Sequence, residues 1–178
     1  CARRKNIQNH RRFGRLEPGP RRTRRHLRHE LGAQHLGGHT GLNPSSTSRA
    51  IPLWRQLQAA ASVLEAVRNG RSTSDSLQKI DADLRPGVQA LSCHVLRNLG
   101  RAEALRRLLA RKPPPAAVDA LLCSVLALAW REDQAPYAPF TLVNQAVEAA
   151  KQSPDTRAQA SFVNACLRRF LRERDDLV

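Results

Sequence analysis

The chain has 178 residues, and its 30 Lys and Arg against 15 Asp and Glu give a net charge of +15, which indicates an anionic partner. No run of apolar residues approaches the length of a membrane-spanning helix, which argues against a membrane protein. The four cysteines are too far apart for a zinc-ligand spacing and fit a reducing compartment, so we expect a cytoplasmic protein without a bound metal.

Composition divides the chain at residue 49. Residues 1–49 carry a net charge of +10 and only 10 apolar residues, whereas residues 50–178 carry +5 and 63 apolar residues. Low hydrophobicity with high charge cannot offset the entropy that is lost on ordering. We therefore expect a basic, disordered leader over residues 1–49 and one folded domain over residues 50–178. The leader is not native if this chain, which contains no Met, is a fragment or a mis-started translation. The arginine doublets of the leader alternatively suit a nucleic-acid-binding arm.

From residue 52 onward, apolar residues recur at steps of three and four, which predicts a series of helices. The apolar stripes run over residues 53–67, 77–80, 86–99, 105–109, 115–130, 142–150 and 162–171. Gly70 and Gly100 stand where glycines end helices, and residues 134–140, with two prolines, are typical of a loop. No segment alternates with the period of a strand. The prediction is an all-α fold, a compact bundle of about seven helices.

The fifth predicted helix, residues 115–130, is apolar nearly all round, which indicates a central, buried helix. Cys93, Cys123 and Cys166 lie among apolar residues of predicted helices, where we expect them to act as small core side chains. None of the cysteines follows a proline, and no glycine-rich cofactor loop or catalytic triad pattern is present. We therefore expect no catalytic residues, no cofactor-binding residues and no metal ligands in this chain.

Three stretches resemble the landmarks of the NusB-like domain family. They are Leu91-Ser-Cys-His-Val-Leu-Arg97 followed by Arg101, Val143-Asn-Gln-Ala-Val-Glu-Ala-Ala-Lys151, and Phe162-Val-Asn-Ala-Cys-Leu-Arg-Arg169. The resemblance covers about residues 52–175. The tail over residues 167–174 is more similar to the N-terminal domain of RsmB-type 16S rRNA (cytosine-C5)-methyltransferases. One departure is Cys93-His94, where the family commonly has an aromatic residue and a glycine.

The resemblance implies that the chain binds RNA. On the first hypothesis it is the N-terminal part of a bacterial 16S rRNA (cytosine-C5)-methyltransferase, truncated before a catalytic domain that uses S-adenosylmethionine. On the second it is a stand-alone transcription antitermination factor that binds RNA and a ribosomal protein. Reading the genomic frame past Val178 would distinguish the two, because only the methyltransferase needs a cofactor loop and a Pro-Cys motif there.

Arginines supply the candidate RNA-binding residues, because a guanidinium binds phosphate bidentately and stacks on unpaired bases. Three arginines occupy the free flank of the last predicted helix, two bracket the start of the first, and one ends the first motif. A solvated helix face is the alternative reading. The predicted RNA-binding residues are Arg49, Arg55, Arg97, Arg168, Arg169 and Arg172.

The remaining polar motif residues favour structural roles. We expect Asn144 and Asn164 to be buried and to tie helices together, and His94 to be a hydrogen-bonded helix residue rather than a base or metal ligand. Glu148 and Lys151 are spaced for an exposed ion pair. Because aromatic residues are few and form no predicted stacking platform, we expect RNA binding to depend on the backbone and shape of the RNA.

Overall fold

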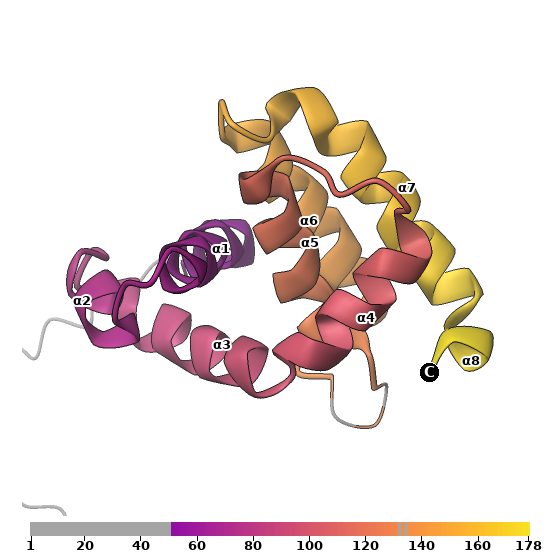
Figure 1. The fold of residues 1–178 in the computed structure, drawn as a ribbon. Coiled ribbons are helices and arrows are strands. Elements are labelled where there is room, and N and C mark those ends of the chain that lie inside the picture. The colour runs from indigo at the N-terminus through magenta and orange to yellow at the C-terminus, as the bar shows by residue number, and fades with distance from the viewer. Residues whose placement is uncertain (1–50, 132, 134) are drawn as a thin grey trace, which may run out of the picture. The chain divides into compact units, whose positions relative to one another are not determined.

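The computed structural model describes residues 51–131, 133 and 135–178 of the chain (Figure 1). The predicted leader, including Arg49, lies outside these residues. The part described is helical throughout, without strands, which confirms the all-α prediction. Its elements are α1 (Leu53–Arg68), α2 (Thr73–Gln78), α3 (Arg85–Arg97), α4 (Leu99–Leu109), α5 (Ala116–Ala129), α6 (Pro139–Gln152), a 3-10 turn (Arg157–Gln159), α7 (Ala160–Arg172) and α8 (Arg174–Leu177).

Two helix boundaries differ from the sequence prediction. Gly70 does follow the end of α1, in the left-handed region with φ of 80°. Gly100, however, lies inside α4; α3 ends at Arg97 and is capped by Asn98, whose Nδ2 donates a hydrogen bond to the His94 carbonyl oxygen at 3.0 Å. The predicted loop over residues 134–140 also ends early, because Pro139 begins α6, where its fixed φ and missing N–H suit a first helical turn.

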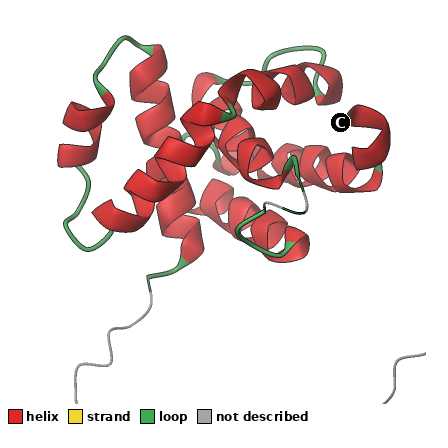
Figure 2. Ribbon diagram, turned by 90° about the horizontal axis from the view of Figure 1, so that it is seen from below, coloured by secondary structure: helices red, strands yellow, loops and turns green. Residues whose placement is uncertain are grey.

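The central helix of the described domain is α5, as its apolar sequence predicts. Every residue from Val118 to Ala129 except Asp119 is buried. Helix α1 packs against α3, α5 and α6, α4 packs against α5, and α6 pairs with α7 (Figures 1 and 2). The largest buried side chain is Phe170, which inserts from α7. None of the described helices is long and apolar enough to span a membrane.

The predictions for His94 and two of the cysteines are confirmed, and the prediction for Cys93 is wrong. His94 is half-buried, and its Nε2 lies 3.2 Å from the Ala127 carbonyl oxygen on α5, as expected of a hydrogen-bonded helix residue. Cys123 and Cys166 are buried. Cys93 is exposed, contrary to prediction, because the buried stripe of α3 follows Val88, Leu91, Ser92 and Val95 and leaves Cys93 outside it.

Candidate nucleic-acid interface

Helix α7 carries three of the predicted arginines on its exposed side. Arg168, Arg169 and Arg172 are exposed, whereas Val163 and Phe170 face the core. The Nε of Arg168 donates a hydrogen bond to Asn164 Oδ1 at 3.0 Å. The sequence therefore placed these arginines correctly on one solvated flank of the helix.

A neighbouring carboxylate neutralises part of this flank. Arg169 Nε lies 2.8 Å from Glu173 Oε2, and Arg172 Nη2 lies 3.1 Å from Glu173 Oε1. The hydrogen bond from Arg169, together with that from Arg172, lowers the pKa of Glu173 despite partial desolvation, so the carboxylate is charged at neutral pH. Among the described residues, Arg168 has no such carboxylate partner, so no ion pair neutralises its charge.

Arg55 lies in a different part of the domain. It is exposed near the start of α1, with Nη2 3.7 Å from Asp81 Oδ2 in the connection between α2 and α3. The two residues and Lys79 line an open cavity of about 340 Å³. In Figure 1, α5 and α6 lie between α1 and α7, so the helix that carries Arg55 is on another side of the domain from α7.

A further basic surface of the described domain lies on α4 and the residues that follow it. Four of its cations are exposed, and no ion pair joins them to a carboxylate within residues 51–131, 133 and 135–178. We call these four residues the α4 basic face: Arg101, Arg107, Arg111 and Lys112. Arg97, a predicted binding residue, is exposed one helix earlier, in the last turn of α3.

The α4 basic face forms no ion pairs with the described carboxylates because Glu103 of α4 and Asp119 of α5 pair with other arginines on the inner side of α4. On the inner side, Arg106 Nε lies 2.8 Å from Asp119 Oδ1 on α5. Asp119 Oδ2 accepts a hydrogen bond from Arg68 Nη1 of α1 at 2.9 Å, and Arg68 Nη2 donates one to Glu103 Oε1 at 2.8 Å. The only acidic residue of α4 is thus occupied by Arg68, and none is left to neutralise the outer side.

This ion cluster also sets the chemistry of a buried thiol. Burial, reinforced by the charge of Asp119, raises the pKa of Cys123 to about 11, although the contact from Arg68 opposes the shift. The thiol is therefore protonated at neutral pH and suits a structural role rather than a nucleophilic one.

An aromatic ring lies against the start of the α4 basic face. The guanidinium of Arg101 lies over the Trp130 ring, 4.8 Å from its centroid, and that of Arg131 lies at 5.5 Å. Such cation–π contacts hold both side chains in place. Arg131 also pairs with Asp133 at 2.6 Å, which raises its pKa.

The two motif asparagines do not tie helices together, so that prediction is wrong. Asn144 is exposed, and Asn164 bonds to Arg168 on its own helix. The amide that joins two helices is the next residue, Gln145, whose Oε1 accepts a hydrogen bond from the Trp54 backbone N–H at 3.0 Å. The expected Glu148–Lys151 pair is likewise replaced, because Glu148 accepts a hydrogen bond from Gln152 at 2.6 Å.

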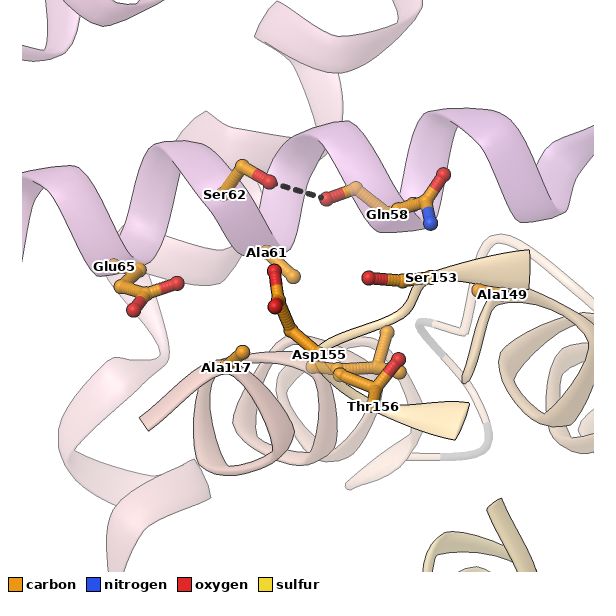
Figure 3. Close-up of a pocket in the computed structure, with 10 residues that line it drawn as sticks. Gln58, Ala61, Ser62, Glu65, Ala117, Ala149, Ser153, Asp155 and Thr156 are labelled. Carbon is orange, nitrogen blue, oxygen red and sulfur yellow. Dashed lines mark hydrogen bonds between the residues drawn. The ribbon is translucent and has the colours of Figure 1, made fainter. Parts of the chain in front are cut away.

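A polar cavity between α1 and the ends of α5 and α6 does not offer a ligand site (Figure 3). Glu65, Ser153 and Asp155 are among its lining residues, but its volume is only about 50 Å³, whereas small-molecule pockets usually exceed about 300 Å³. Thr156 uses its hydroxyl to bond the Ala150 carbonyl oxygen. No group of His, Cys, Asp and Glu in the described part of the chain could hold a metal ion.

The sequence analysis missed the α4 basic face, although its signal is visible. Residues 101–112 hold five cations and one acidic residue. Which cations stay exposed depends on the contacts of Arg68 and Arg106 with α5, and these contacts require the fold.

Comparisons with known proteins give one positive result. The model of the NusB family matches residues 54–172, which is most of the chain. No curated protein and no solved structure matches.

Proposed function

The chain belongs to the NusB family, and on that basis we propose that its α4 basic face and the α7 arginines bind the phosphate backbone of RNA. Domains of this family bind RNA in general. The observation that carries the proposal is the set of exposed cations on α4 that no described carboxylate neutralises. Helix α4 contacts α7, so the two arginine-bearing helices are neighbours (Figure 1).

The physical basis of such binding is the release of counterions from RNA. Each phosphate that a cation neutralises releases condensed counterions, so affinity falls with salt in proportion to the number of contacts. Cations that already pair with carboxylates, such as Arg169, contribute less because the pair must first break. The α4 basic face should therefore account for more of the salt dependence than the end of α7.

The test is a charge reversal of three residues of the α4 basic face, measured by fluorescence anisotropy on a labelled RNA hairpin over a range of salt concentrations. The matched control reverses three exposed cations on other elements, so that both variants change net charge equally. The test variant carries Arg101→Glu, Arg107→Glu and Arg111→Glu; the control carries Arg71→Glu, Lys79→Glu and Arg157→Glu.

We expect the test variant to bind at least about tenfold more weakly at low salt, and the slope of log affinity against log salt to decrease by about 2–3. The control variant should retain most of the wild-type affinity and most of the wild-type salt slope. Equal losses in the two variants would show that only net charge matters, and would overturn the assignment of the α4 basic face.

We further propose that the domain orients 16S rRNA for a cytosine-C5 methyl transfer performed by a catalytic domain outside residues 54–172. The similarity of residues 167–174 to the methyltransferase branch supports this. Such a domain would bind S-adenosylmethionine and supply the thiolate that attacks the base. Sequencing the reading frame beyond Val178 tests the proposal: a glycine-rich loop and a Pro-Cys motif are expected, whereas a stop codon would favour the antitermination factor with its ribosomal-protein partner.

A further inference from the structure

An exposed aromatic ring lies beside the α7 arginines. Phe140, in the first turn of α6, is 79% exposed, which makes it the most exposed large apolar side chain of the described residues. Another aromatic ring, that of Phe170 on α7, is by contrast fully buried. Leaving Phe140 in water gains nothing for folding, and an exposed aromatic ring is a common feature of binding sites.

Two hollows flank this ring. One, of about 310 Å³, is lined by Phe140, Arg168, Leu171 and Arg172. The other, of about 170 Å³, is lined by Pro139, Phe140, Leu171 and Arg174. Each hollow therefore combines the apolar surface of Phe140 and Leu171 with arginine, and neither includes a carboxylate residue in its lining.

The combination of an aromatic ring with arginines indicates which class of ligand fits the two hollows. An apolar peptide over the first hollow would leave the guanidinium of Arg168, which has no carboxylate partner among the described residues, without a counter-charge, and a free phosphate would gain nothing from the Phe140 ring. A nucleotide satisfies both, because its base stacks on an aromatic face and its phosphate pairs with arginine. Only an unpaired base exposes its face in this way, since the bases of a duplex stack on one another.

We propose that Phe140 is a stacking site for an unpaired RNA base, with Arg168 and Arg172 holding the adjacent phosphate. Leu171 forms the apolar floor of the site, which accepts any base because every base has an aromatic face. The proposal deepens the RNA-binding function above and rests on it. It adds a preference for single-stranded RNA, which the α4 basic face alone does not provide.

The experiment compares two probes that carry equal numbers of phosphates, a labelled oligoadenylate and an abasic oligomer of the same length. Phe140→Ala in the full chain should weaken oligoadenylate binding at least about fivefold and leave abasic binding unchanged. Phe140→Trp should keep the affinity, and its added fluorescence should be quenched by oligoadenylate. Leu108→Ala is the matched control, because Leu108 is 55% exposed between arginines of α4, and it should bind both probes as the wild type does.

Other outcomes overturn the inference in distinguishable ways. If Phe140→Ala binds oligoadenylate as tightly as the wild type, or loses affinity for both probes equally, Phe140 does not stack on a base. If the substitution instead converts a dimer into a monomer in sedimentation without affecting RNA, the ring contacts a second copy of the chain. If the wild type binds neither probe, the proposed RNA-binding function itself fails. Because Phe140 is so exposed, the variant should melt with the wild type.

Discussion

Replacing Asp119 by Asn should lower the free energy of unfolding by about 3 kcal/mol. The carboxylate accepts Arg68 at 2.9 Å and lies 2.8 Å from Arg106, and its side chain is only 14% exposed. Each charge-assisted contact at such a site contributes about 1.5 kcal/mol, and the substitution removes the charge that supports both. The side-chain volume is unchanged, so no cavity adds to the loss. Arg68 would then keep only the Glu103 carboxylate, and Arg106 would lose the carboxylate with which it pairs.

Urea unfolding followed by far-ultraviolet circular dichroism measures this change. The matched control is Asp133→Asn, because Asp133 forms an even shorter ion pair with Arg131, at 2.6 Å, but is 62% exposed. The control should unfold at the wild-type urea concentration, since exposed pairs contribute little. If both variants unfold together, or if Asp119→Asn matches the wild type, then burial does not strengthen the cluster and the reasoning is refuted.

Three further predictions concern the core and its thiols. Burial raises the pKa of the Cys123 thiol to about 11, so the unfolded chain loses this proton at lower pH than the folded chain, and the free energy of unfolding falls as pH rises. Relative to Cys123→Ala, the wild type should lose about 2 kcal/mol in urea unfolding between about pH 9 and 11. Parallel pH curves for the two proteins would contradict this. Alkylation mapped by mass spectrometry should label exposed Cys93 in the folded chain and reach Cys166 only after unfolding, and equal labelling rates would refute their assigned burial. Phe170→Ala should cost about 4 kcal/mol in urea unfolding because the ring is fully buried, and a loss below about 1 kcal/mol would be inconsistent with that packing.

The helices were predictable because each buries one continuous apolar stripe. The stripe of α1 and the all-round apolar sequence of α5 are strong local signals, and the structure has both helices where the sequence predicts them. The boundaries were harder. Gly100 is as compatible with a helix interior as with a helix end, and the earlier stop after Arg97 depends on the bond of Asn98 to His94. Local sequence does not distinguish these two uses of a glycine.

The candidate binding surface was only partly predictable, since the sequence shows charge but not its partners. The α7 arginines lie on the predicted flank, yet their neutralisation by Glu173 reflects side-chain geometry at the end of the helix. The exposure of Phe140 was missed because a ring within a proline-containing stretch gives no sign of which way it faces. Asn144 misled for the same reason, as its apolar neighbours suggested burial and the helix turned it outward.

The ion cluster around Asp119 affects how α4 can meet a polyanion. Arg68 pairs with Glu103 and so joins α1 to α4, and Arg106 pairs with Asp119 and so joins α4 to α5. The backbone of α4 is therefore held in place before a partner binds. Binding then restricts only side-chain rotation, and the entropic penalty of association is smaller than it would be on a loop. The step of six residues from Arg101 to Arg107 spans about 9 Å of helix axis. Because this separation along the helix is fixed, α4 should favour RNA whose phosphates match it.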